Sequence, residues 1–287
     1  MEKYVIVMDV SGDISEDFAA KMGIKFVPMQ YSLGDEMRTS YGIESADVLK
    51  KFYDGQRNGD LTKTSQITPY MYEEFFTPIM EEGYSVLYMS LSSGLSATYN
   101  SACLAKQILK EKFPNLDLYP VDTLAATGGI GLLVERAVQN KEKGMTIEDN
   151  YNDIINIRPK LRHWLLVQDL MYLKRGGRVS ATKAVFGSML NIKPILKLDE
   201  VGKLQTIEKK RGNKAAVKQL FNYFVGSYNP ATGNTVYICD GDCRDLANDL
   251  ANMIKEKYPE VIIKQTTLCP IIGAHTGPGL VVICHFA

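Results

Sequence analysis

The strongest constraint on the fold is a regular alternation of short apolar runs and amphipathic segments in the first half of the chain. Apolar runs at 4–8, 85–91 and 116–121 have the length of buried strands, and helical spacing at 15–22 and 95–113 follows the first two of them. Strands that alternate with helices over short connections form mostly parallel sheets with helices on both faces. The sequence therefore predicts an α/β fold.

This rhythm changes after Pro159, which ends a helix that opens at Thr146. The second half carries a hairpin over 194–208, and 287 residues exceed the usual size of one core. We expect two closely packed α/β domains, 1–158 and 159–287, with a cleft between them, since no flexible linker separates them. Further helices are predicted at 44–53, from 69, and at 171–174, 183–190, 213–228 and 244–258, and further strands at 25–29, 164–168, 235–239, 261–266 and 280–286.

Charge and composition exclude several classes of partner. The 33 basic and 33 acidic side chains balance, so no broad field favours nucleic acid or an anionic membrane. No apolar stretch approaches the roughly 20 residues that cross a bilayer, and the first apolar run is too short for a signal peptide. Five irregularly spaced cysteines give no metal-site pattern. We expect a cytoplasmic protein without stable membrane insertion, nucleic-acid binding or metal.

Two segments concentrate small hydroxyl side chains at predicted strand ends. They are 62–66, with Thr64 and Ser65, and 90–98, with Ser92 and Ser93. A strand–loop–helix junction directs backbone N–H groups and hydroxyls at one spot and adds the positive end of a helix dipole. Such a site suits a carboxylate or phosphate, although the same hydroxyls could simply cap helices.

A third segment, 272–279, is predicted to be a loop in which glycines frame His275 and Thr276. His163 and His285 are expected to be structural. Two basic clusters, 173–178 and 209–214, could meet a phosphate or an acidic partner, or be solvated charge at turns.

Two better-known motifs are incomplete. Residues 127–131 lack the third glycine of the dinucleotide-binding fingerprint, and residues 94–98 lack the final glycine of a nucleophile elbow. Neither dinucleotide binding nor an elbow hydrolase is therefore predicted.

Short segments over the whole chain form an ordered set: Asp9 with Ser11 and Asp13, then 64–66, 91–98, 121–123, 173–178, 191–195, 211–212 and 273–279. Taken in this order, they resemble the DegV family of bacterial fatty-acid-binding proteins. The chain departs from the family pattern at Val10, where a serine is usual, and at Ala97, where a glycine is usual.

The resemblance implies two α/β domains with a fatty-acid tunnel inside and a carboxylate site near the domain interface. It implies a carrier in phospholipid metabolism, without catalysis and with no cofactor other than bound fatty acid. This carrier presents its long-chain fatty acid to a separate fatty-acid kinase, which makes the acyl phosphate from ATP. By motif, the carboxylate shell comprises Thr64, Ser65, Ser92, Ser93, Gly94, Ser96, His275 and Thr276. The partner-facing or phosphate-facing residues are Arg175, Arg178 and Arg211.

Burial energetics agree with this assignment. An acyl chain of about 15 methylenes gains on the order of 12 kcal/mol before ordering and association costs. A buried carboxylate needs hydrogen-bond partners, and hydroxyls with main-chain N–H groups supply them without a tight ion pair. Two alternatives stay open: an acyl hydrolase or acyltransferase with Ser93 as nucleophile and His275 as base, and a binding module for another small anion.

Overall fold

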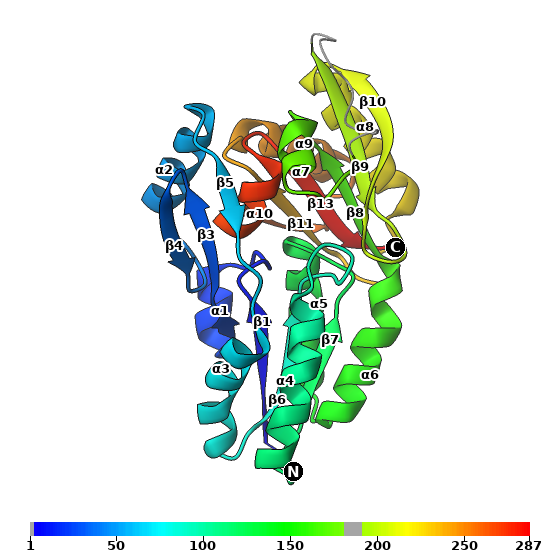
Figure 1. The fold of residues 1–287 in the computed structure, drawn as a ribbon. Helices are drawn as coiled ribbons and strands as arrows, with labels where there is room; N and C mark the ends of the chain where they lie inside the picture. The colour runs from blue at the N-terminus through cyan, green and yellow to red at the C-terminus, as the bar shows by residue number, and fades with distance from the viewer. Residues whose placement is uncertain (1–2, 181–190) are drawn as a thin grey trace.

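The computed structural model describes residues 3–180 and 191–287. Four parallel strands in the order β2-β1-β6-β7 form the first sheet, which confirms the predicted α/β class. This sheet is the lower lobe in Figure 1. Its strands are β1 (Tyr4–Asp9), β2 (Lys25–Val27), β6 (Ser85–Ser90) and β7 (Leu118–Asp122). The helices of this region are α1 (Glu16–Met22), α3 (Pro69–Glu81), α4 (Thr98–Lys112), α5 (Gly128–Glu142) and α6 (Ile147–Ile157), followed by the 3-10 turn η1 (Arg158–Lys160).

The parallel sheet is buried on both faces. Successive residues of β6 alternate between two cores: Leu87 and Met89 enter one, and Val86 and Tyr88 enter the other. A strand buried in this way reads as a continuous apolar run, which is why the sequence reveals it.

A mixed six-stranded sheet in the order β10-β9-β8-β13-β11-β12 forms the upper lobe in Figure 1. Only the β11–β12 pair is parallel, and β9 and β10 form the predicted antiparallel hairpin. Its strands are β8 (Leu161–Leu166), β9 (Ile192–Leu198), β10 (Leu204–Arg211), β11 (Thr235–Asp240), β12 (Ile262–Thr267) and β13 (Val281–Phe286). Its helices are α7 (Leu170–Arg175), α8 (Asn213–Ser227), α9 (Arg244–Lys257) and α10 (Pro270–Thr276).

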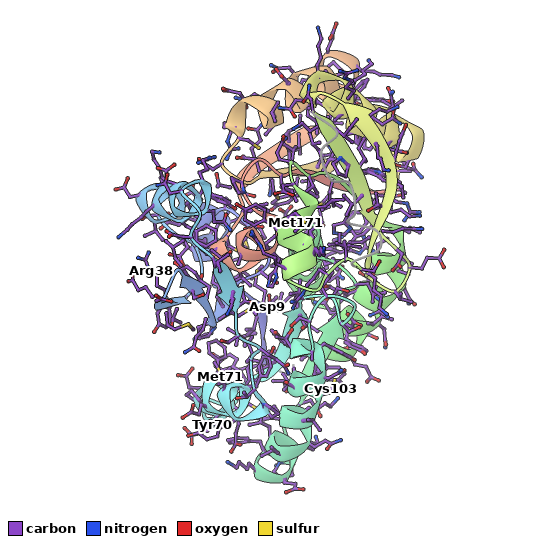
Figure 2. The ribbon with its side chains drawn as sticks, turned by 45° about the horizontal axis from the view of Figure 1, so that its top comes forward. Asp9, Arg38, Tyr70, Met71, Cys103 and Met171 are labelled. Atoms are coloured by element: carbon purple, nitrogen blue, oxygen red, sulfur yellow. The ribbon has the colours of Figure 1, made fainter. Side chains whose placement is uncertain are left out.

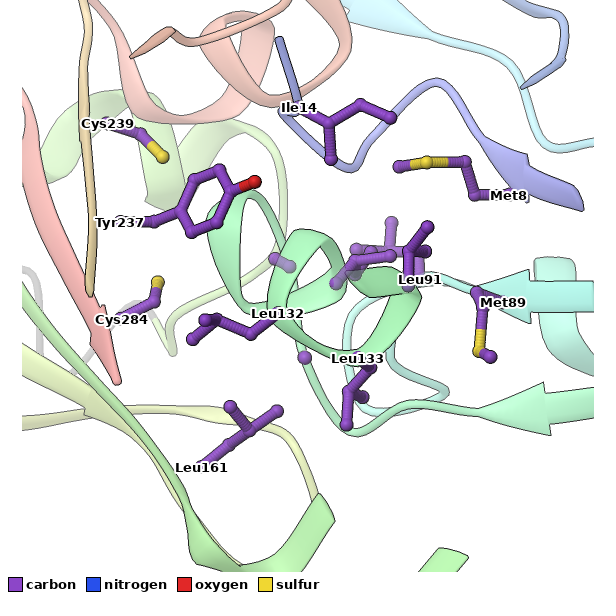
Figure 3. Packing of buried hydrophobic residues seen from close by; sticks show 14 of the residues in the cluster. Met8, Ile14, Met89, Leu91, Leu132, Leu133, Leu161, Tyr237, Cys239 and Cys284 are labelled. Atoms are coloured by element: carbon purple, nitrogen blue, oxygen red, sulfur yellow. The ribbon is translucent and has the colours of Figure 1, made fainter. Parts of the chain in front are cut away.

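Helix α5 lies between the two sheets. Figure 3 shows Leu132 and Leu133 of α5 between Met89 of the first sheet and Cys284 of the second, and all four belong to one core. Three glycines in its first turn allow this approach, because a Cβ at Gly128 would lie 2.3 Å from Tyr237 Cβ. The incomplete dinucleotide motif is thus a packing feature, and the helix itself was not predicted.

A third sheet, in the antiparallel order β4-β3-β5, was also not predicted, since the apolar run at 25–29 covers β2 of the first sheet and only the first residue of β3. It comprises β3 (Met29–Leu33), β4 (Glu36–Ser40) and β5 (Thr62–Thr64), with α2 (Ala46–Arg57) between β4 and β5 in the chain. It lies at the left of Figure 1, beside α10. The hydroxyl of Tyr53 on α2 donates to the carbonyl of Leu268, 3.0 Å away, just before α10.

Some predictions from the sequence are wrong in part, and others cannot be compared with the described residues. The predicted loop at 272–279 is wrong in part, since α10 extends to Thr276, and the segment 62–66 begins as strand β5. The predicted helix 183–190 lies outside the described residues. Among the described helices, none combines the length and apolar character needed to cross a membrane. The division at residue 158 stays a prediction.

Candidate functional site

A largely apolar cavity lies where the three sheets meet, and the centre of a water molecule can reach about 190 Å³ of it. Leu91 and Ala126 enter it just after the carboxyl ends of β6 and β7, the usual place for a ligand in a parallel sheet. Its apolar wall is Met29, Leu91, Leu95, Ala97, Ala126, Leu165, Leu173, Leu198, Leu204, Ile271, Ile272, Leu280 and Val282. Its polar wall is Thr64, Ser65, Gln66, Ser96, Thr127, His163, Arg178, His275 and Thr276.

Thr64 and His275 form the best-defined polar contact of this wall. Thr64 is the last residue of β5, and His275 lies in the last turn of α10. The Thr64 Oγ1 and His275 Nε2 atoms are 2.8 Å apart, although 211 residues separate them in the chain. The structure thus brings together two residues that the sequence assigned to the same site.

The His275 imidazole is neutral near pH 7. Burial, reinforced by the positive charge of Arg178, lowers the pKa of His275 to about 4. A neutral ring can donate one hydrogen bond and accept another, and with the Thr64 hydroxyl it forms a polar group without charge.

The low pKa of His275 predicts a specific acid sensitivity. Between pH 4 and 6.5 the unfolded chain binds the proton that folded His275 excludes, so the stability due to the neutral ring is full above 6.5 and is lost toward 4. The unfolding free energy of the wild type minus that of His275→Gln should fall by about 2 kcal/mol from pH 7 to pH 4.5. Denaturant unfolding of both proteins measures it. Asp13, whose pKa burial raises to about 8, is present in both proteins and cancels. A pH-independent difference would contradict the assignment.

Arg178 lies on the cavity wall, although the sequence grouped it with partner-facing residues. It is the only Lys or Arg among the described wall residues, and no Asp or Glu is among them. Its Nε donates to the carbonyl of Leu95, 3.0 Å away, and its Nη1 donates to the carbonyl of Gly176. The motifs predict neutral donors for an acid group, and the cavity wall adds one cation.

Arg175 and Arg211 are exposed. The Arg175 guanidinium lies over the ring of Tyr172, 4.5 Å from its centroid. Figure 2 shows Met171, on the same short helix α7, at the surface above Asp9. These two arginines are therefore available to a partner and not to the cavity.

The structure does not bring Ser92, Ser93 or Gly94 to the cavity wall. Ser92 Oγ donates to the carbonyl of Gly202 at the tip of the β9–β10 hairpin, 2.8 Å away. The exposed Ser93 hydroxyl donates to the Asp122 carboxylate over 2.5 Å. Ser92 and Gly94 therefore lie against the hairpin tip at Gly202, and Ser93 is held by Asp122.

Ser65, Ser96 and Thr276 do line the cavity. Thr276 Oγ1 donates within α10 to the carbonyl of Ile272, 3.1 Å away, whereas Ser96 Oγ accepts from the N–H of Thr98 over 3.3 Å. A hydroxyl that only accepts keeps its proton for another acceptor, so Ser96 is the better ligand donor.

Asp9 supports the loop that carries Leu91 and Ser96. Its Oδ2 accepts from the N–H of Leu91 over 2.7 Å and from the hydroxyl of Tyr88 over 3.1 Å. Val10, which departs from the family pattern, is buried in the core, so a hydroxyl there is not needed by this network.

Three residues of the polar wall were not assigned to the site from the sequence. Thr127 adopts φ 54 at the start of α5, Gln66 donates to the hydroxyl of Ser101 over 2.8 Å, and His163 was expected to be structural. Burial lowers the pKa of His163 to about 4, so this ring is also neutral. Gln66 directly follows Thr64 and Ser65 in the sequence, and this position could have identified it as a site residue.

Comparisons with known proteins agree over the whole length of the chain. A family model described as an uncharacterised protein of the DegV family matches residues 3–287. A DegV domain-containing protein of Clostridium perfringens is 36% identical over 283 residues, which cover 99% of this chain and 97% of the relative.

Solved structures are similar as well. A Thermotoga maritima protein, described as revealing fatty acid binding function, has a TM-score of 0.85 at 27% identity, with 100% of both chains covered. The fatty acid kinase (Fak) B3 protein of Streptococcus pneumoniae, solved with linoleic acid, has a TM-score of 0.85 at 21% identity over 99% of both chains. At that identity the second likeness concerns the fold alone.

Proposed function

We propose that this chain, which belongs to the DegV family, holds one long-chain fatty acid with its tail in the apolar part of the cavity and its carboxylate at the polar wall. The observation that carries the proposal is an apolar cavity with the Thr64–His275 pair and Arg178 on its wall. The fatty acid binding described for the Thermotoga maritima protein supports it.

The proposed carboxylate shell is Thr64, Ser65, Ser96, His275 and Thr276, with Arg178 as the nearby cation. Hydroxyls, a neutral imidazole and one arginine offset the loss of carboxylate hydration, which an apolar wall alone would not do. The apolar wall gains about 0.8 kcal/mol for each methylene it buries.

We also propose that a separate fatty-acid kinase takes the bound acid as substrate and that this chain performs no chemistry itself. The exposed cations Arg175 and Arg211 are suited to an acidic partner surface or to phosphate. The name of the Streptococcus pneumoniae protein is consistent with such a partner. A Ser93 hydrolase lacks support, because the Ser93 hydroxyl is bound to Asp122, away from the cavity wall.

Organic extraction of the purified protein, followed by mass spectrometry, should yield a fatty acid. Titration of delipidated protein with oleate should show Thr64→Val binding about tenfold more weakly than the wild type, because one hydrogen-bond donor is lost from a buried anion. Thr39→Val makes the same exchange on β4, away from the wall, and should bind like the wild type.

Two results would overturn the proposal. One is a protein that carries no fatty acid and does not bind oleate after delipidation. The other is displacement of oleate by millimolar inorganic phosphate, which would favour a site for another small anion.

A further inference from the structure

Two polar side chains behind the cavity wall bind the backbone of α10. Gln56 Nε2 donates to Thr62 Oγ1 over 3.0 Å and to the carbonyl of Gly273 over 2.9 Å. Thr62 Oγ1 donates in turn to the carbonyl of Ala274, 2.9 Å away. Both amide protons of Gln56 and the hydroxyl proton of Thr62 are used. We call this arrangement the Gln56–Thr62 clamp.

The clamp is buried and lies outside the cavity wall. Gln56 is only 3% exposed, which is unusual for an amide side chain, and neither Gln56 nor Thr62 lines the cavity. Burying an amide is unfavourable unless its hydrogen bonds are satisfied, and here both N–H groups are, whereas the Gln56 Oε1 atom has no partner among the described residues. The donor groups of the clamp are therefore used within the protein, and neither residue lines the cavity where a ligand would bind.

The clamp holds the last turn of α10, which carries His275. Carbonyls at the end of a helix have no partner within the helix, and Thr62 supplies one to Ala274, the residue before His275. Thr62 and Thr64 are two residues apart in β5, so their side chains leave the same face of the strand. Thr62 thus fixes the backbone of α10 against the strand from which Thr64 reaches the His275 ring.

We propose that Gln56 and Thr62 are positioning residues for the carboxylate site, which set the distance between Thr64 and His275 that a long-chain monocarboxylate requires. This inference rests on the proposed function. A hydrogen-bond site loses affinity steeply when its donors move by about 1 Å, while an apolar wall tolerates such movement.

The test compares two ligands with the same tail, oleate and oleyl alcohol. In delipidated full-length protein, Thr62→Val and Gln56→Leu should each lower the preference for oleate over oleyl alcohol about fivefold to tenfold, with oleyl alcohol affinity changed less than about twofold. Thr62→Ser keeps the hydroxyl and should restore the preference. Thr39→Val, in the same sheet but away from the clamp, should leave it unchanged.

A purely structural role would lower the melting temperature and leave the ligand preference as in the wild type, and that result would overturn the inference. If Gln56→Leu does not fold, the Thr62→Val and Thr62→Ser pair decides alone. If the wild-type protein binds neither ligand, the proposed function fails and the inference fails with it. If the wild type binds oleate but the variants keep its ligand preference, only the inference fails.

Discussion

Gly128→Ala should lower the free energy of unfolding by about 3 kcal/mol, since overpacking of a tight interface costs roughly this much. The new methyl group would lie 2.3 Å from Tyr237 Cβ and 2.9 Å from Cys239 Sγ. Tyr237 Cβ is attached directly to strand β11, so it cannot rotate away, and the start of α5 must move. Thermal or denaturant unfolding of the variant measures the loss.

Gly226→Ala is the matched control. Gly226 lies near the end of α8, and a Cβ there would meet no atom within 4 Å. Alanine has less conformational freedom than glycine in the unfolded chain and therefore loses less entropy when the helix forms. The free energy of unfolding of this variant should rise by about 0.5 to 1 kcal/mol. Equal stability changes in the two variants would contradict the close packing of α5 against β11.

Arg178→Met should weaken oleate binding roughly 100-fold and oleyl alcohol binding far less. Arg178 is the only cation on the described cavity wall, so its loss leaves a buried carboxylate with neutral partners alone. Methionine preserves much of the apolar stem, which separates the lost charge from lost packing. Competition binding with both ligands gives the two affinities.

Arg175→Met serves as the control, because Arg175 is exposed on the neighbouring helix α7 and does not line the cavity. It should bind oleate like the wild type. Equal losses for oleate and oleyl alcohol in Arg178→Met would mean that Arg178 mainly holds the Leu95 and Gly176 carbonyls, and the electrostatic role would be rejected.

The helices and strands that were predicted correctly are those whose own residues carry a local pattern, such as apolar periodicity. The helix predicted from residue 69 is α3, which begins at Pro69 after the Thr68 cap, and the β9–β10 hairpin follows from two strand patterns across one turn. Helix α5 was missed because its first turn is rich in glycine, a poor helix former, and only the close approach of two sheets explains those glycines.

The residues of the site were predictable from the sequence only in part, because local motifs identify residues but not the contacts between distant segments. The order of motifs pointed to Thr64 and His275, but their 2.8 Å contact depends on how β5 meets α10, which no local pattern encodes. Ser92 and Gly94 have the composition of an anion loop, yet a Cβ at Gly94 would lie 2.6 Å from the Gly202 carbonyl. Glycine there serves the approach of a hairpin more than 100 residues away, as the Ser92–Gly202 separation of 110 residues shows.

The residues of the cavity wall come from separate short segments that lie as far apart in the chain as Met29 and Val282. A molecule that fills this space contacts several of these segments at once, in addition to direct links such as the Thr64–His275 and Arg178–Leu95 contacts, and it acts as a removable cross-link between them. By mass action, a ligand present at 100 times its dissociation constant adds about 2.7 kcal/mol to the folded state. Ligand occupancy and folding stability are therefore coupled, and the ligand-bound and ligand-free forms should differ in their free energy of unfolding.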